Sequence, residues 1–170
     1  MNKAYTFRKG NFSDLGQIRD LTILAYMQYQ NVIAIENVEA WKKGRENENT
    51  FIELLKIAHC FVCEYEDGIV GSAFLIPHGN PYNWFESEWA YIRLLAVHPD
   101  FEGNGIGRRL TQMCIDTAKE TGETIVALHT SEFQDAARHI YENLGFVKRR
   151  DLDLIYGKQY YLYTLELSQQ

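Results

Sequence analysis

Three glycines in a five-residue turn, Gly103-Asn-Gly-Ile-Gly107, have the clearest chemical meaning in this sequence. The turn lies between a predicted strand and a predicted helix, so its backbone N–H groups converge at the positive end of a helix dipole and favour an anion, most often phosphate. Two common phosphate motifs do not fit. A P-loop needs Gly-Lys-Ser/Thr where Arg108 follows Gly107, and the third glycine of a dinucleotide fingerprint falls on Leu110. A tight structural connection without a ligand is the alternative interpretation.

The turn is part of a longer pattern with a partner further along the chain. Residues 95–110 read Leu-Ala-Val-His-Pro-Asp-Phe-Glu-Gly-Asn-Gly-Ile-Gly-Arg-Arg-Leu, and residues 137–146 read Ala-Arg-His-Ile-Tyr-Glu-Asn-Leu-Gly-Phe. Together they resemble the two signature motifs of the GNAT superfamily of N-acetyltransferases, its acyl-CoA pyrophosphate loop and its helix-to-strand segment. The resemblance is strong over residues 91–146, and the order of predicted elements is consistent with it along the whole chain.

The resemblance implies a site for acetyl-CoA as cosubstrate. The glycine turn would hold the pyrophosphate, and the backbone of the preceding strand would pair with the pantetheine arm in a gap beside a parallel strand at 124–130. The residues implied for acetyl-CoA are Leu95, Ala96, Val97, Glu102, Gly103, Asn104, Gly105, Ile106, Gly107 and Arg108. Glu102 departs from the family, which usually has Arg or Gln there, and places a carboxylate beside phosphates. We expect binding to survive, with Arg108 or Arg109 offsetting that charge.

Tyr141 is the residue that the resemblance implies for catalysis. It matches the tyrosine with which the family commonly protonates the departing CoA thiolate or hydrogen-bonds its sulfur. The alternative is a helix tyrosine packed on the sheet with its hydroxyl in water.

The acceptor side is less well defined by the sequence. Strand alternation predicts Tyr91, Arg93 and Leu95 on one face, which makes Tyr91 and Arg93 candidate substrate contacts. Neither is a good base at neutral pH, so a water-mediated route is expected to deprotonate the amine. An inward Arg93 indicates a carboxylate or another anionic group on the acceptor. Other acids and bases nearby are predicted to be solvated surface groups: Glu86, Glu88 and His129.

Aromatic residues could line an acceptor pocket, although core packing is their commoner role. They are Tyr26, Tyr29, Trp84, Phe85 and the tyrosines in 156–163.

Hydrophobic periodicity and turn residues predict the elements that position this site. The expected strands are 5–8, 59–65, 69–76, 89–97, 124–130, 146–153 and 160–167. The expected helices begin at a Ser13 N-cap, at a Thr50–Glu53 capping box, at Gly105 and at residue 133. Residues 36–49 are expected to be a partly helical connection and residues 77–88 a loop. Strand, helix and strand over 89–130 form a βαβ unit.

Three cysteines are expected to be free thiols in a reducing cytosol. Cys60 and Cys63 lie three apart on a predicted strand and therefore point to opposite faces, which disfavours a shared disulfide or metal ion. His98, Asp100 and Glu102 lack a fourth ligand at recognisable spacing, so no metal site is expected.

Composition restricts the class of protein. The 170 residues are 46% hydrophobic, which fits one globular domain over 1–170. The net charge of −6 disfavours nucleic acid or anionic lipid as partners and mildly favours a cationic substrate. No apolar run approaches the ~20 residues needed to span a bilayer, and the first ten residues do not resemble a signal peptide, so a cytoplasmic location away from the membrane is expected.

The sequence therefore predicts an α/β domain of the α+β type. A mixed, mostly antiparallel sheet of six or seven strands would contain one splayed parallel pair, with helices on both faces. The resemblance implies an N-acetyltransferase that transfers acetyl from acetyl-CoA to a primary amine of a small molecule or peptide by direct attack. The alternative is a non-catalytic acyl-CoA-binding or sensor domain of the same fold. The assembly state, monomer or homodimer, stays open.

Overall fold

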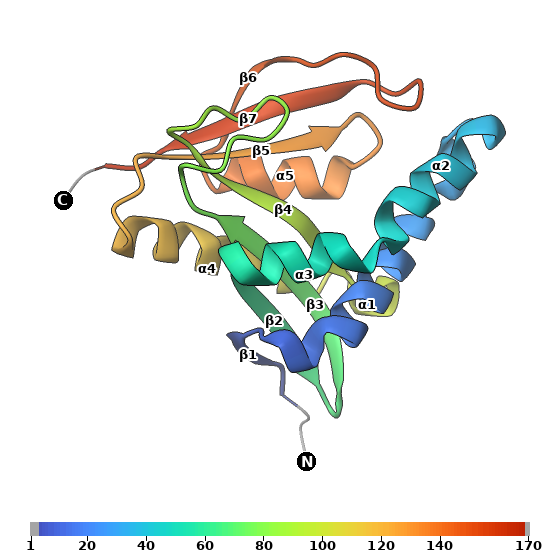
Figure 1. Cartoon of the computed structure of the whole chain (residues 1–170), viewed down its shortest axis with the longest axis horizontal. Coiled ribbons are helices and arrows are strands. Elements are labelled where there is room, and N and C mark those ends of the chain that lie inside the picture. Colours follow the sequence, from blue (N-terminus) through green and yellow to red (C-terminus); the bar gives the residue numbers. More distant parts are fainter. Residues whose placement is uncertain (1–3, 169–170) are drawn as a thin grey trace.

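The computed structural model describes residues 4–168, which form one seven-stranded mixed sheet (Figure 1) in the order β1-β2-β3-β4-β5-β7-β6. The strands are β1 Thr6–Lys9, β2 His59–Tyr65, β3 Gly68–Ile76, β4 Ala90–Val97, β5 Ile125–Ser131, β6 Val147–Asp151 and β7 Tyr160–Glu166. The helices are α1 Leu15–Met27, α2 Ile35–Glu46, α3 Glu48–Ile57, α4 Ile106–Glu120 and α5 Asp135–Asn143. Short 3-10 turns cover Phe12–Asp14, Gln30–Val32 and Pro99–Phe101.

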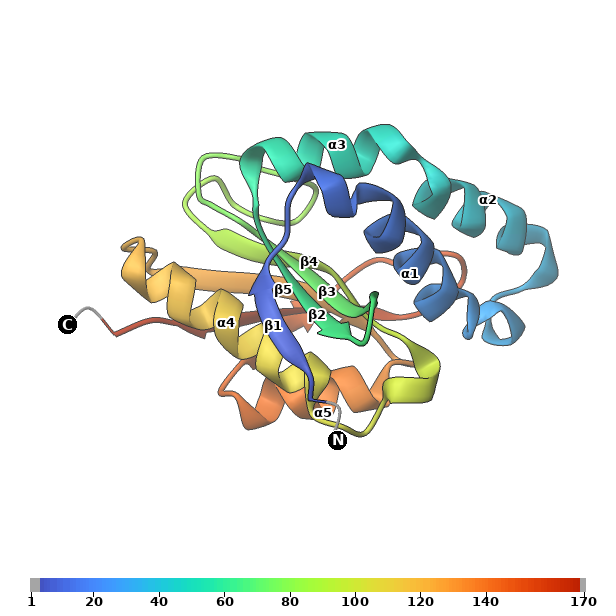
Figure 2. The same ribbon diagram turned by 90° about the horizontal axis from the view of Figure 1, so that it is seen from below.

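Helices cover both faces of the sheet (Figure 2). The pair α1 and α3 packs over one apolar cluster, and the pair α4 and α5 packs over a second one. On one face α1 and α3 contribute Ile18, Leu21 and Phe51, while on the other α4 and α5 contribute Leu110 and Tyr141. The central strand β3 is buried along nearly its whole length because both faces are covered. The predicted fold class, sheet and helix arrangement are thus confirmed.

Only β4 and β5 run parallel, and they pair at one end alone. Their register joins Ala90 to Val126 and Tyr91 to Ala127, after which the strands diverge, whereas every other neighbouring pair is antiparallel. The predicted splay is therefore present. Beyond Tyr91, the edge of β4 that faces β5 carries backbone groups that β5 does not satisfy.

A bulge in β4 changes which side chains share a face. Arg93 pairs with Phe74 but Ala96 pairs with Ser72, so β4 has one residue more than β3 in this interval, and Leu94 adopts a left-handed φ of 52°. The predicted common face of Tyr91, Arg93 and Leu95 is consequently wrong. Tyr91 packs in the α1–α3 cluster, whereas Leu95 packs against the α4–α5 cluster.

The N-terminal helices begin differently from the prediction. Asn11, not Ser13, caps the first turn, and its side chain and that of Asp14 form a reciprocal capping box. Asn47, not Thr50, caps α3 by accepting from the Asn49 N–H at 3.1 Å. Residues expected to be a partly helical connection form the full helix α2.

Three further features concern residues 4–168. The cysteines are buried free thiols, with Cys60 and Cys63 in opposite clusters as predicted. No helix in this part of the chain is long and apolar enough to cross a bilayer. Nor do three His, Cys, Asp or Glu side chains in it gather where they could hold a metal ion.

Candidate active site

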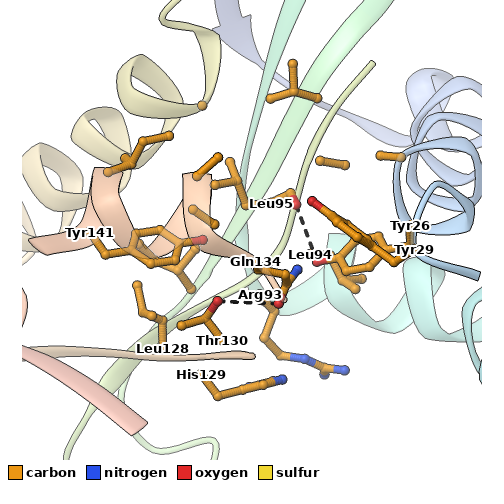
Figure 3. A pocket seen from close by; sticks show the side chains of 18 of the residues that line it. Tyr26, Tyr29, Arg93, Leu94, Leu95, Leu128, His129, Thr130, Gln134 and Tyr141 are labelled. Carbon is orange, nitrogen blue, oxygen red and sulfur yellow. Dashed lines mark hydrogen bonds between the residues drawn. The ribbon is translucent and has the colours of Figure 1, made fainter. Parts of the chain in front are cut away.

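A cavity of about 1140 Å³ lies where β4 and β5 diverge (Figure 3). Its walls come from β4, β5, the turn before α4, helices α1, α2 and α5, and the segments around Trp84 and Tyr156. Most of the residues predicted for acetyl-CoA line it: Leu95, Ala96, Val97, Glu102, Gly103, Gly105, Ile106, Gly107 and Arg108. Arg93 and Tyr141 line it as well. One cavity therefore brings together most of the candidate cofactor residues, the catalytic candidate Tyr141 and one of the two acceptor candidates, Arg93.

The glycine turn has the backbone geometry of an anion site. Gly103 and Gly105 both have a φ of 77°, which a residue with a Cβ adopts at a cost, and no atom lies within 4 Å of where their Cβ would be. The first backbone bond of α4 runs from the Arg109 N–H to the Gly105 carbonyl at 3.0 Å. The N–H groups before Arg109 therefore have no helical acceptor, and the helix dipole adds positive charge to them.

Asn104 does not line the cavity. Its amide donates to the carbonyls of Phe101 and Glu102 at 3.0 and 3.2 Å, so it supports the turn from behind. Any contact between Asn104 and a ligand would come from its backbone.

The Glu102 carboxylate has a partner other than the expected one. It accepts a hydrogen bond from the Gln28 amide, just after α1, at 3.1 Å, and it is among the causes that raise the pKa of Tyr29 to about 12, burial being the larger. Within residues 4–168, neither Arg108 nor Arg109 forms an ion pair with it. The direct partner of Glu102 is therefore Gln28 and neither of these arginines.

The open edge of β4 forms one wall of the cavity. The hydroxyl of Tyr26, a half-buried residue of α1, donates to the Leu95 carbonyl at 3.3 Å. Gly107 lies behind this wall, since a Cβ there would be 3.6 Å from a Val97 methyl and 4.0 Å from a Leu95 methyl. The N-terminus of α4 is thus packed directly on the part of β4 that β5 leaves unpaired.

Tyr141 reaches the same space from α5, and Figure 3 shows its ring among the cavity residues. Its side chain is only 6% exposed, and burial raises its pKa well above the usual range. The phenol therefore keeps its proton at neutral pH and can act as a hydrogen-bond or proton donor. The predicted alternative, with the hydroxyl in bulk water, does not match this burial.

Arg93 and His129 define the other end of the cavity. The Arg93 guanidinium lies 4.1 Å from the centre of the Tyr82 ring. His129 lies 5.4 Å from the Trp84 ring, and its Nδ1 is buried without a hydrogen-bond partner. Burial, and then the charges of Arg93 and Arg45, lower the pKa of His129 to about 4. The expectation that His129 is a solvated surface group is wrong.

Tyr91 does not line the cavity, although the sequence made it a candidate substrate contact. Its ring stacks on Phe85 at 4.4 Å, and its hydroxyl donates to the Asn80 carbonyl at 2.8 Å. It therefore anchors the loop of residues 77–88. The aromatic residues that do line the cavity are Tyr26, Tyr29, Tyr82, Trp84, Phe101, Tyr156 and Tyr160.

Arg45 is the lining residue that the sequence analysis missed. It belongs to α2, and its guanidinium lies 4.3 Å from the Trp41 ring and 4.7 Å from the Tyr26 ring. The spacing of Trp41 and Arg45 is i, i+4, which would have placed them on one helical face had residues 36–49 been predicted as a helix.

The comparison with protein families agrees with this geometry. The model of the Acetyltransferase (GNAT) family matches residues 22–146. The chain belongs to the GNAT family. A relative in Methanocaldococcus jannaschii, an uncharacterized N-acetyltransferase, is 30% identical over 153 residues, which are 86% of this chain and 62% of that protein. The GNAT chain described here thus spans less than two thirds of that relative's length.

Solved structures share the GNAT fold at low sequence identity. PaiA N-acetyltransferase from Thermoplasma acidophilum, solved in complex with coenzyme A, aligns with a TM-score of 0.78 at 15% identity, covering 96% of this chain and 99% of that one. A ribosomal-protein-alanine N-acetyltransferase from Escherichia coli aligns with a TM-score of 0.73 at 19% identity, covering 97% and 95%. These likenesses confirm the fold expected of a GNAT protein.

Proposed function

We propose that this chain is a single-domain, acetyl-CoA-dependent N-acetyltransferase that acts on a primary amine of a small molecule or peptide. The observation that carries the proposal is the convergence of the glycine turn, the open edge of β4 and Tyr141 on one cavity. The turn offers N–H groups to a pyrophosphate, and the edge of β4 that β5 leaves unpaired after Tyr91 offers an extended partner to an amide-containing arm. Family membership supports the same cosubstrate.

The reaction follows from where these groups lie. The neutral amine attacks the thioester carbonyl carbon, a C–N bond forms, and the C–S bond of the adduct then breaks. Tyr141 donates a hydrogen bond or a proton to the departing thiolate. Burial keeps the phenol protonated for this role, and because the raised pKa makes the phenol a weaker acid, the hydrogen bond is the easier of the two. The proton lost by the amine is expected to pass to water, because Glu102 is engaged by Gln28, Asp135 is paired with Arg138, and the pKa of His129, about 4, makes its imidazole a weak base.

The alternative function is a sensor that binds acyl-CoA without turnover. The Glu102 carboxylate on the cavity wall and the lack of an evident base favour it. Release of free CoA thiol distinguishes the two functions, because only a transferase releases it when acetyl-CoA and an amine are present together.

Calorimetry with acetyl-CoA tests the binding half of the proposal. Gly105→Asp would place a carboxylate where the N–H groups converge, and we expect it to abolish detectable binding. Gly122→Asp is the matched control, since Gly122 also has a positive φ, of 81°, has open space around it and follows the other end of α4. Unchanged affinity in folded Gly105→Asp would contradict the proposed cosubstrate site.

We place the protein in the cytoplasm, which its three buried free thiols support. Whether it acts as a monomer or a homodimer can be measured by light scattering.

A further inference from the structure

Among the described residues, three arginines on the cavity wall have no carboxylate partner: Arg108, at the glycine turn proposed for the pyrophosphate, and Arg45 and Arg93, which lie outside that turn. Within residues 4–168, Arg8, Arg19, Arg138 and Arg149 each pair with an acidic side chain, whereas Arg45 and Arg93 pair with none. Both line the cavity. Burial lowers the pKa of Arg45, which shows that its charge is held at an energetic cost.

Aromatic rings hold both guanidinium groups by their faces. Arg45 lies against Trp41 and Tyr26, and Arg93 lies over Tyr82 at 4.1 Å, with one amino group 3.5 Å from the Tyr82 hydroxyl. A ring face attracts the cation but leaves the donors in the guanidinium plane free.

The donors of Arg45 are only partly used. One amino group donates to the Trp41 carbonyl at 3.0 Å, while the Arg45 Nε is buried without an acceptor. A buried donor without an acceptor is costly, so the hydrogen-bonding capacity of Arg45 is incompletely satisfied in this structure.

The two guanidinium groups lie at the same end of the cavity. Arg45 lies 4.7 Å from the Tyr26 ring, and the Tyr26 hydroxyl donates to the carbonyl of Leu95, two residues after Arg93 in β4. Both guanidinium groups also lower the pKa of His129. His129, with a pKa of about 4, is neutral at pH 7, so it adds no positive charge to that of the two arginines. The local charge is therefore positive, opposite in sign to the net charge of −6 of the whole chain.

The acidic side chains of the cavity wall are already engaged. Glu102 accepts from Gln28, and Asp135 forms an ion pair with Arg138. Neither neutralises Arg45 or Arg93. An anion that enters with the acceptor is the missing partner.

We propose that Arg45 and Arg93 form a carboxylate site, and that the acceptor is a small primary amine that carries a free carboxylate, such as a free amino acid. This inference rests on the proposed acetyltransferase function. A planar carboxylate matches the in-plane donor pair of a guanidinium, and the aromatic wall leaves these donors as the main polar contacts there. A protein N-terminus has no carboxylate beside its amine and would leave both cations unpaired.

The test compares free L-amino acids with the corresponding amino acid amides in a thiol-release assay. The amide removes the charge and keeps the amine and the side chain. We expect kcat/KM for the acid to exceed that for the amide by about 10–100-fold, the range of one or two charge-assisted hydrogen bonds. Equal turnover of acid and amide would overturn the carboxylate site and leave the acetyltransferase function standing.

Variants of the two arginines test whether they cause the preference for the acid over the amide. Arg93→Gln and Arg45→Gln should raise KM for the acid about 10-fold or more while changing KM for the amide little. Arg150→Gln, which removes an exposed charge from the edge strand β6, is the control and should behave as wild type. Arg45→Lys keeps the charge and the ring contacts but loses the planar fork, so it tests the site if Arg45→Gln does not fold. Wild-type KM for the acid in Arg93→Gln and in the folded Arg45 variant would refute the inference.

Two further experiments test the carboxylate site separately from the proposed transferase function. Calorimetry with N-acetyl amino acids, in the presence of CoA, measures the carboxylate contact without turnover, and Arg93→Gln should weaken this binding. If no amine releases thiol but this difference is present, the transferase function fails and the carboxylate site stands. Phosphoethanolamine is compared with β-alanine, and preferential turnover of phosphoethanolamine would overturn a carboxylate in favour of a phosphate.

Discussion

His129 makes the stability of this protein depend on pH below neutrality. Its ring lies in β5 between aromatic neighbours, 5.4 Å from Trp84, 5.8 Å from Phe85 and 5.9 Å from Tyr160. Burial, followed by the charges of Arg93 and Arg45, lowers its pKa from 6.5 to about 4. The folded protein therefore resists protonation of this imidazole, and the unfolded chain does not.

The sign of the effect follows from proton counting. Between pH 6.5 and pH 4 the unfolded chain binds more protons at His129 than the folded protein does, so the free energy of unfolding falls as the pH falls. Above pH 7 the residue contributes nothing to the pH dependence. The difference of about 2.5 pKa units corresponds to about 3 kcal/mol once the pH is below 4, and to about 2 kcal/mol at pH 5.

Urea unfolding at pH 7.5 and at pH 5.0 measures this loss. His129→Phe keeps a ring in the aromatic setting and removes the titration, so it should lose about 2 kcal/mol less than wild type between the two pH values. Carboxylates that lose ion pairs in acid, such as Asp14 with Arg8, affect both proteins equally and cancel in the comparison. His139→Gln, a change at an exposed histidine of α5, should follow wild type.

Two results would refute this reasoning. One is an equal loss of stability in wild type and His129→Phe. The other is an NMR titration of the His129 ring with a midpoint near 6.5, which would show that the ring is not shielded as the structure indicates.

Three other changes test the site and the core. Tyr141→Phe should lower kcat by about 10²–10⁴-fold and leave acetyl-CoA affinity in calorimetry nearly unchanged; near-normal turnover would show that water or another group protonates the thiolate. Glu102→Gln should tighten acetyl-CoA binding because it removes a negative charge beside the phosphates, and weaker binding would assign Glu102 a structural role. Gly71→Ala should lower the free energy of unfolding by about 1–3 kcal/mol, because its Cβ would lie 2.5 Å from an Ile106 methyl. Gly16→Ala, in open space on α1, should instead raise the free energy of unfolding by about 0.5–1 kcal/mol in the same urea experiment, and equal effects of the two changes would contradict the packing argument.

Local sequence signals predicted the elements around the glycine turn well. Residues 105–122 have helical spacing of apolar residues and end at a glycine, and α4 with Gly122 at a φ of 81° matches them. The N-terminal caps were harder to predict, because Asn11, Ser13, Asn47 and Thr50 are all good capping residues and the local pattern does not rank them. Packing of α1 and α3 on the sheet decides between them.

Arg45 and His129 show why the acceptor end could not be predicted. Arg45 lies in a polar stretch, and His129 ends an apolar strand, so either side chain could have faced solvent. Arg45 contacts Trp41 in its own helix, but its position also depends on Tyr26 of α1, and that of His129 depends on Trp84 of the loop before β4. Sequence spacing predicts neighbours within one helix or strand, whereas Tyr26 and Trp84 belong to other parts of the chain than the residues that they contact.

The bulge in β4 explains how one strand serves both ends of the cavity. Leu is an unusual residue for a φ of 52°, so nothing at Leu94 signals the bulge, and it becomes evident only from the register with β3. A regular strand would turn Leu95 to the same face as Arg93. The inserted residue instead directs Leu95 toward Gly107 at the N-terminus of α4, while Arg93 stays beside Tyr82. Residues 93–95 thus supply both a cation for the acceptor, Arg93, and an apolar support for the cofactor turn, Leu95. The two proposed ligands would consequently lie next to each other in one cavity.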